Sequence, residues 1–169
     1  FVLVAGALST SPERNAESAA ACGIAPDRIY DDFAEMARAE AARPDGIEAV
    51  SICTPPRGRM QVIGEALAHD LDVMIEKPPA ATISEAETFA GMAQDAGRVF
   101  YATWHSREAA AVEPAKKWLH GKTIRRVAVN WKEDVRVWHP GQAWIWEPGI
   151  GVFDPGINAL SVLTHILPL

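Results

Sequence analysis

The sequence has few cysteines, no metal-binding pattern and no excess of positive charge. Cys22 and Cys53 fall in a helix-like and a strand-like segment, and we expect both to be ordinary small buried residues. No Cys/His spacing typical of zinc occurs, so we expect neither a metal site nor a disulfide scaffold. The net charge of −6, without a basic stripe, argues against a nucleic-acid partner.

The sequence also lacks a long apolar run. None reaches the roughly 20 residues of a membrane-spanning helix, which argues against a membrane partner. No signal peptide is visible, and we expect a cytoplasmic protein. The 169 residues are 49% apolar, which is enough for a packed core. This length is typical of one domain, or of one domain and part of another.

Short apolar stretches alternate with helix-like stretches in the first part of the chain. We expect strands at residues 2–8, 29–30, 49–53, 73–75 and 99–103. We expect the intervening helices at residues 12–22, 32–42, 57–69 and 84–96. This alternation predicts βαβ units and a parallel sheet.

Helix-capping residues support these boundaries. Ser11 before Pro12 is a good N-cap for the first helix, and Asp31 or Asp32 caps the second. Ser84 with Glu87 predicts a capping box for the fourth helix. Gly97 is a natural residue to end that helix.

A lysine follows the apolar run at residues 73–75. Such a run is typical of a strand buried on both faces of a parallel sheet. Pro78 and Pro79 cannot continue a sheet ladder, so Lys77 stands at the carboxyl end of the strand. Open α/β sheets bind their ligands at that edge. The alternative is a solvated lysine on a turn.

Several motifs flank this lysine. Glu76-Lys77-Pro78 follows one apolar strand, and Thr54-Pro55-Pro56 closes the preceding one. Further motifs lie at residues 131–136, 138–142 and 151–158. Together they resemble the Gfo/Idh/MocA family of nicotinamide-dependent sugar oxidoreductases, and the downstream segments resemble its aldose 1-dehydrogenase branch. The resemblance covers nearly the whole chain.

The resemblance implies an α/β fold in two parts. Residues 1–104 would form a Rossmann-type, parallel-sheet, NAD(P)-binding domain. Residues 105–169 would begin an α+β substrate-binding and oligomerisation domain with an open sheet. A dinucleotide-binding fold needs an earlier strand and a glycine-rich turn, and no G-x-G-x-x-G occurs here. We therefore expect a fragment that lacks its first strand, the Gly-rich turn and most of the C-terminal domain.

The expected cofactor site begins where the first strand ends. In dinucleotide folds this position contacts the adenosine ribose, and an acid there would favour NAD. The sequence instead has Ser9 and Thr10, with Arg14 one turn on, which suits the 2′-phosphate of NADP. NADP is therefore favoured over NAD; the alternative is a capped helix with a surface arginine. The resemblance adds four cofactor-binding residues, namely Thr54, Pro55, Glu76 and Lys77.

A second sheet is expected to begin after a helix at residues 108–120. Residues 124–133 alternate as a strand does, with Val127, Val129 and Trp131 on one face. Glu133 closes this apolar face, and a carboxylate there requires a partner or a ligand. The alternative is a solvated acid at a fraying strand end.

A long loop at residues 134–150 carries three tryptophans. Loops of this length are usually functional, and indole rings cover the C–H faces of sugars. We expect Trp138 to contact a sugar. The alternative is that Trp138, Trp144 and Trp146 pack beneath the loop, and we expect at least one of the three to do so. His139 is expected either to donate to a sugar hydroxyl or to satisfy a loop carbonyl.

The last helix is expected to open at Asp154-Pro155. Asp154, Asn158 and Ser161 share one polar face, whereas the apolar side consists of Leu160, Leu163 and Leu167. Asp154 as a simple helix cap is the alternative. The common family pattern has histidine where this chain has Asn158, and the aldose 1-dehydrogenase branch has asparagine there. Acid–base chemistry would therefore come from Lys77 or Asp154.

The resemblance implies NAD(P)-dependent oxidation of an aldose, of the L-arabinose or D-galactose type, at C1 to the aldonolactone. The catalytic residues would be Lys77 and Asp154. The sugar-binding residues would be Glu133, His139, Asn158 and Trp138. The full-length protein would be a homo-oligomer. Two alternatives remain: a non-catalytic, NADP-binding sugar-sensing regulator of the same fold, and an inositol or sugar-acid dehydrogenase.

Overall fold

The computed structural model describes residues 1–148 and 150–167, and it divides into two compact units. Unit 1 comprises Phe1–Ile75 and Thr82–Tyr101. Unit 2 comprises Glu76–Ala81 and the chain from Ala102 onward. Across the two described ranges, no helix is long and apolar enough to cross a membrane.

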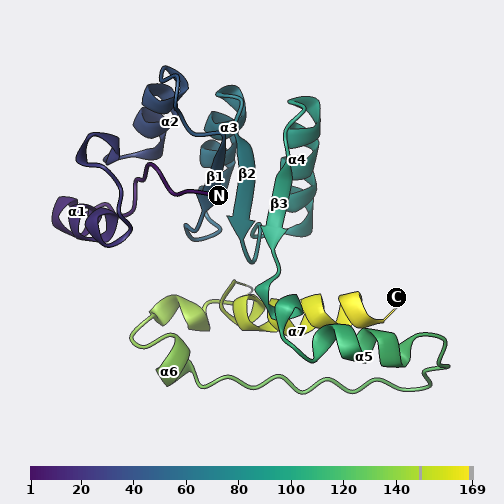
Figure 1. Cartoon of the computed structure of the whole chain (residues 1–169). Coiled ribbons are helices and arrows are strands. Elements are labelled where there is room, and N and C mark those ends of the chain that lie inside the picture. Colours follow the sequence, from purple (N-terminus) through teal and green to yellow (C-terminus); the bar gives the residue numbers. More distant parts are fainter. Residues whose placement is uncertain (149, 168–169) are drawn as a thin grey trace. The chain divides into compact units, whose positions relative to one another are not determined.

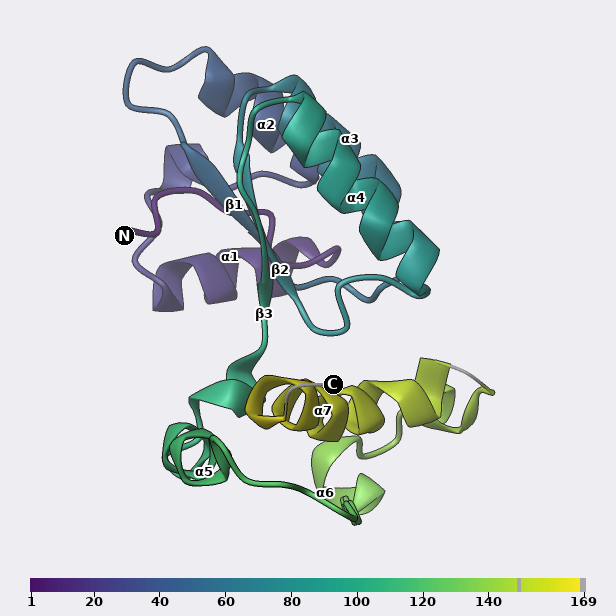
Figure 2. The same ribbon diagram turned by 90° about the vertical axis from the view of Figure 1, so that its right-hand side faces the viewer.

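A three-stranded sheet with the order β1-β2-β3 lies at the centre of unit 1. Its strands are β1 (Ala49–Ile52), β2 (Asp72–Glu76) and β3 (Phe100–Thr103). β1 and β2 are parallel, with Val50 opposite Val73. The crossover helices α3 (Arg59–Ala68) and α4 (Ile83–Asp95) lie along one face of the sheet (Figures 1 and 2). Each strand is therefore joined to the next by a helix, which confirms the expected Rossmann-type α/β arrangement.

Burial alternates along β2, although the strand was expected to be buried on both faces. Val73 and Ile75 are 1% and 0% exposed, whereas Met74 between them is 40% exposed. Successive side chains of a strand point to opposite faces. Within the described residues, the face that packs against α3 and α4 is covered at this point and the face with Met74 is not.

The expectation that the two cysteines are buried is wrong, because both are exposed. Cys53 follows β1 on the face of Ser51, and its Sγ lies 3.6 Å from Ser51 Oγ. Cys22 is the C-cap residue of α1 (Pro12–Ala21) and points outward from the end of that helix.

The first two helices begin at their expected caps. Ser11 Oγ accepts a hydrogen bond from the backbone N–H of Arg14 at 3.4 Å and caps α1. Asp32 Oδ1 accepts from the N–H of Glu35 at 2.8 Å and caps α2 (Phe33–Ala41). Both caps are local side-chain contacts, which is why the sequence alone predicts them.

The cap of α4 differs from the expected one. Thr82 Oγ1 accepts from the N–H of Glu85 at 3.1 Å, so Thr82 is the N-cap and Ser84 lies inside the helix. The Thr82/Glu85 pair has the same spacing as the expected Ser84/Glu87 box, which is wrong by two residues. Gly97 follows the helix with a φ of +65°, as expected of a residue that ends a helix.

The first segment is not a strand of the sheet, contrary to the expectation for residues 2–8 and 29–30. It forms one parallel bridge, between Gly6 and Ile29. The Gly6 N–H donates to the Arg28 carbonyl at 3.1 Å, and the Tyr30 N–H donates to the Gly6 carbonyl at 3.0 Å. A strand requires a continuous ladder of such bonds, and the described residues supply a single rung here.

Unit 2 contains short helices and one long one. They are η2 (His105–Glu108), α5 (Val112–Leu119), α6 (Val135–Trp138), η3 (Ala143–Trp146) and α7 (Ile150–Ile166). The helix expected at residues 108–120 is shorter, because α5 begins at Val112 and Glu108 ends the preceding η2. Residues 124–133 are extended and form no strand (Figure 1), so the predicted start of a second sheet is wrong for the described residues. A strand exists only when a neighbour accepts and donates its backbone hydrogen bonds, and this segment has none in the described chain.

The last helix begins earlier than expected. α7 starts at Ile150, so Pro155 lies inside the helix and Asp154 is not its cap. An added turn is held by the Gly151 N–H, which donates to the Glu147 carbonyl at 3.1 Å. Proline is tolerated near a helix start because it removes a single backbone bond there. Leu160, expected on the apolar side, is exposed, whereas Asn158 on the expected polar side is buried.

Candidate active site

Lys77 directly follows β2, where the prolines stop the strand. Its backbone N–H donates to Glu76 Oε2 at 3.0 Å, and the Lys77–Pro78 peptide bond is cis. Glu76, expected to contact a cofactor, thus hydrogen-bonds to the backbone of the next residue. Residues 76–81 belong to unit 2, so the lysine shares a compact unit with α7.

The side chain of Lys77 is paired with Asp154 of α7. Its Nζ lies 3.1 Å from both Oδ1 and Oδ2, and 3.4 Å from the Asp154 carbonyl oxygen. The two side chains are only 15% and 14% exposed. A partly shielded ion pair keeps the ammonium oriented, and it leaves a carboxylate beside it that can exchange a proton.

His139 also lies near the Asp154 carboxylate. Its Nε2 is 3.7 Å from Asp154 Oδ2. It occupies the C-cap position of α6, where its N–H donates to the Val135 carbonyl at 2.9 Å. The imidazole packs edge-on against Trp144, with centroids 5.2 Å apart and an interplanar angle of 77°. Lys77, Asp154 and His139 therefore form one cluster.

A cavity of about 380 Å³ adjoins this cluster. Its lining residues are Val135, Arg136, His139, Gly141, Gln142, Ala143 and Trp146. At its α6 rim, Arg136 hydrogen-bonds the side chain of Asp134 and donates a backbone bond to it, which holds the pKa of Asp134 below its usual value. The wall is thus mainly apolar, with Arg136, His139 and Gln142 as its polar side chains, and an apolar wall with a few polar groups suits a small ligand.

Asn158 lies one turn after Asp154 and is buried. Its Oδ1 accepts a hydrogen bond from Ser106 Oγ at 3.1 Å, and its backbone carbonyl accepts from Ser161 Oγ at 2.8 Å. Nearby, Arg107 Nε donates to the Ser161 carbonyl at 3.0 Å. The structure thus places Asn158 beside the cluster along α7, with its amide oxygen bound to η2.

Two of the expected sugar-binding residues lie apart from this cluster. Glu133 is exposed on the extended segment, and its Oε1 accepts a hydrogen bond from Trp131 Nε1 at 2.6 Å. Trp138 is exposed on α6, whereas it is Trp144 that packs against His139. As expected, one loop tryptophan is therefore engaged by the protein itself.

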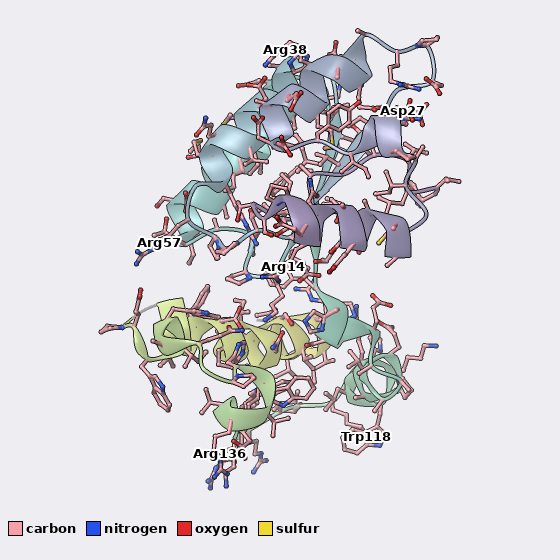
Figure 3. The ribbon with its side chains drawn as sticks, turned by 90° about the vertical axis from the view of Figure 1, so that its left-hand side faces the viewer. Arg14, Asp27, Arg38, Arg57, Trp118 and Arg136 are labelled. Carbon is pink, nitrogen blue, oxygen red and sulfur yellow. The ribbon has the colours of Figure 1, made fainter. Side chains whose placement is uncertain are left out.

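The expected cofactor residues of unit 1 follow its N-terminal segment and the end of β1. Ser9 Oγ accepts from the Ser11 N–H at 3.2 Å, and Thr10 is exposed. Figure 3 shows Arg14 and Arg57 at the end of unit 1 where β1 and β2 finish, and Arg38 at the opposite end. Exposed hydroxyls and a guanidinium at this edge fit the phosphates and ribose of a dinucleotide.

Two buried residues hold the backbone next to these cofactor residues, and the sequence did not reveal either of them. Asn15, 2% exposed, accepts from the Leu8 N–H and donates to the Tyr30 carbonyl, both at 2.8 Å. Arg59 is also buried, and its Nε donates to the Thr54 carbonyl at 3.0 Å. Thr54 and the adjacent Pro55, both exposed, are thereby fixed after β1. These bonds of Asn15 and Arg59 to the backbone are ones that no side-chain motif reveals.

A parallel sheet with helical crossovers, and a lysine directly after one of its strands, is the arrangement of a dinucleotide-binding α/β protein. The chain belongs to the Gfo/Idh/MocA oxidoreductase family with an NAD-binding Rossmann fold, which matches residues 2–103. Galactose 1-dehydrogenase from Pseudomonas fluorescens is 48% identical, over 73% of this chain and 40% of that protein.

Solved structures show the same relationship. The crystal structure of D-galactose-1-dehydrogenase from Rhizobium etli is 51% identical, with a TM-score of 0.70 over 78% of this chain and 43% of that chain. An inositol dehydrogenase homologue from Azotobacter vinelandii, complexed with NADH and myo-inositol, is 31% identical, with a TM-score of 0.85 over 99% of this chain and 45% of that chain. The chain thus spans less than half the length of each of these relatives.

Proposed function

We propose that the protein oxidises an aldose of the D-galactose or L-arabinose type at C1 to the aldonolactone, with a nicotinamide cofactor. The contact between Lys77 Nζ and the Asp154 carboxylate carries this proposal, because it supplies a hydroxyl-polarising cation and a proton acceptor in one cluster. The 48% identity to a galactose 1-dehydrogenase supports the choice of substrate.

The reaction removes one hydride and one proton from the sugar. A nicotinamide cofactor held by residues 1–104 would supply the acceptor for the hydride that leaves C1. Lys77 donates a hydrogen bond to the C1 hydroxyl oxygen, which favours loss of the hydroxyl proton. Asp154 holds the ammonium in place and takes up that proton, while the C1–O bond becomes the lactone carbonyl. Of the expected sugar ligands, His139 and Asn158 lie near Asp154, whereas Glu133 lies on the extended segment and Trp138 is exposed on α6.

We assign the cofactor to residues 1–104 and the sugar to residues 105–169 of a homo-oligomeric protein. NADP is the preferred cofactor, because Ser9, Thr10 and Arg14 stand where an acid would favour NAD. Arg14→Ala should lower the ratio of kcat/KM for NADP to that for NAD. Arg38→Ala, which changes an exposed arginine at the opposite end of unit 1, is the matched control. An unchanged ratio in Arg14→Ala excludes a phosphate contact.

A second candidate is an inositol dehydrogenase, which the similarity to the Azotobacter vinelandii homologue with bound myo-inositol favours. A third is a sugar-acid dehydrogenase, and a fourth is a sugar-sensing regulator that binds NADP without turnover. The intact natural protein should be mixed with NADP or NAD and D-galactose, L-arabinose or myo-inositol, and the absorbance of reduced nicotinamide followed. Turnover with the aldoses supports the proposal. Turnover with myo-inositol alone favours the second candidate, and binding without reduction favours the regulator.

A further inference from the structure

The carboxamide of Gln142 lies between two rings of the loop. Trp144 Nε1 is 2.9 Å from Gln142 Oε1, and His139 Nδ1 is 3.2 Å from the same atom. An indole N–H only donates, so the amide atom that it meets must be the oxygen and not the NH₂ group. Trp144 therefore determines which way the amide of Gln142 faces.

This orientation of the amide determines where His139 carries its proton. A carboxamide oxygen only accepts, so the contact with Nδ1 is a hydrogen bond when Nδ1 carries hydrogen. The other neutral tautomer, with hydrogen on Nε2, would place the lone pair of Nδ1 against a lone pair of Gln142 Oε1. The edge-on packing of His139 on Trp144 limits rotation of the ring away from this contact.

The opposite nitrogen then faces the catalytic carboxylate of the proposed reaction. His139 Nε2 lies 3.7 Å from Asp154 Oδ2, and Lys77 binds the same carboxylate. With hydrogen fixed on Nδ1, the neutral ring offers a lone pair at Nε2. A proton taken up there gives an imidazolium whose charge stabilises ionised Asp154.

We infer that Gln142 is a positioning residue, which fixes the hydrogen of His139 on Nδ1 and keeps Nε2 available to take up a proton beside Asp154. The role of that proton in turnover rests on the proposed function. The tautomer rests only on the contacts of Gln142 with Trp144, of Gln142 with His139 and of His139 with Trp144. Gln142 also lines the cavity next to the cluster, so a ligand there lies against the same side chain.

The test is long-range ¹H–¹⁵N NMR of histidine-labelled intact protein, at a pH well above the ordinary histidine pKa of about 6.5. We expect His139 of the wild type to carry hydrogen on Nδ1. Gln142→Met, which keeps the length but removes the acceptor, should abolish this preference, and Gln142→Glu should retain it. Trp144→Phe keeps an aromatic ring but releases the amide, and should weaken the preference. His165, whose Nε2 contacts Glu113, is the internal control and should be unchanged throughout.

Two results overturn the inference: hydrogen on Nε2 of His139 in the wild type, or an unchanged tautomer in both Gln142→Met and Trp144→Phe. Neither result depends on turnover, so they are distinguishable from a failure of the proposed function. In an active protein, Gln142→Met should lower kcat by about 10-fold or more, as loss of a group that orients a functional histidine does. Gln142→Glu should instead retain most of the wild-type kcat.

Discussion

Lys77 Nζ lies 3.1 Å from each carboxylate oxygen of Asp154, although the two residues are 77 positions apart. The lysine follows a strand that prolines end, and the aspartate lies near the start of the longest helix. Both side chains are largely shielded, so each charge depends on the other for compensation. Substitutions at either residue can separate the chemical role of this pair from its structural role.

Lys77→Met keeps the bulk of the side chain and removes the ammonium. We expect kcat to fall about 10²–10⁴-fold, the usual contribution of a general acid or base, with little change in cofactor affinity. Steady-state kinetics and a fluorescence titration of the cofactor measure the two effects. Lys122→Met is the control, because Lys122 packs over the ring of Trp118 away from the cluster, and its kcat should equal that of the wild type.

Asp154→Asn retains the shape of the side chain but removes the charge and the proton acceptor. We expect a similar loss of kcat, and the double variant with Lys77→Met should be little worse than either single one. Residues that act as a unit give such non-additive losses. Losses that multiply in the double variant would show that the two side chains act independently.

Asn158→Ala should raise KM for the sugar and leave kcat nearly unchanged, since it removes hydroxyl contacts but no proton carrier. The substitution also deletes the acceptor of the Ser106 hydroxyl. Ser106→Ala removes that internal bond alone and is the matched control. An equal rise of KM in Ser106→Ala would assign Asn158 to positioning of α7 instead of sugar binding.

The starts of α1 and α2 and the end of β2 could be predicted because their causes are local. Ser11 and Asp32 cap the helices that they precede, and Pro78 stops β2 wherever the rest of the chain lies. Residues 124–133 were expected to be a strand and form none in the described chain, because the cause of a strand is not local. Alternation of side chains indicates a half-buried strand, but whether a strand forms depends on a partner elsewhere.

The residue types of the candidate site could be predicted from the sequence, but the contacts that hold these residues in place could not. The motif at Lys77 and the downstream Asp154 led to the pair, since their chemistry is visible in the sequence. Gln142 and Asn15 act through contacts with a ring nitrogen and with backbone groups. Such contacts follow from tertiary packing, and glutamine or asparagine in a loop or a helix has no pattern that reveals them.

Asn15→Ala tests whether Asn15 holds in place the segment that leads to Ser9 and Thr10. It leaves the Leu8 N–H and the Tyr30 carbonyl without their shared partner, so the free energy of unfolding should fall by about 1–3 kcal/mol. KM for the cofactor should rise as well, because Ser9 and Thr10 follow Leu8 directly. Chemical denaturation and steady-state kinetics of the intact protein measure both. Glu17→Ala, at an exposed position of the same helix, is the control and should change neither quantity.

The most direct test of the account follows the hydrogen at C1 of the sugar. The intact protein is incubated with D-galactose that carries deuterium at C1 and with oxidised NADP, and the reduced cofactor is analysed by NMR and mass spectrometry. We predict that deuterium appears at C4 of the nicotinamide ring, and that Lys77→Met under the same conditions yields far less of this product. Reduced cofactor without deuterium, or a cofactor that stays oxidised while it and the sugar bind, would contradict oxidation at C1.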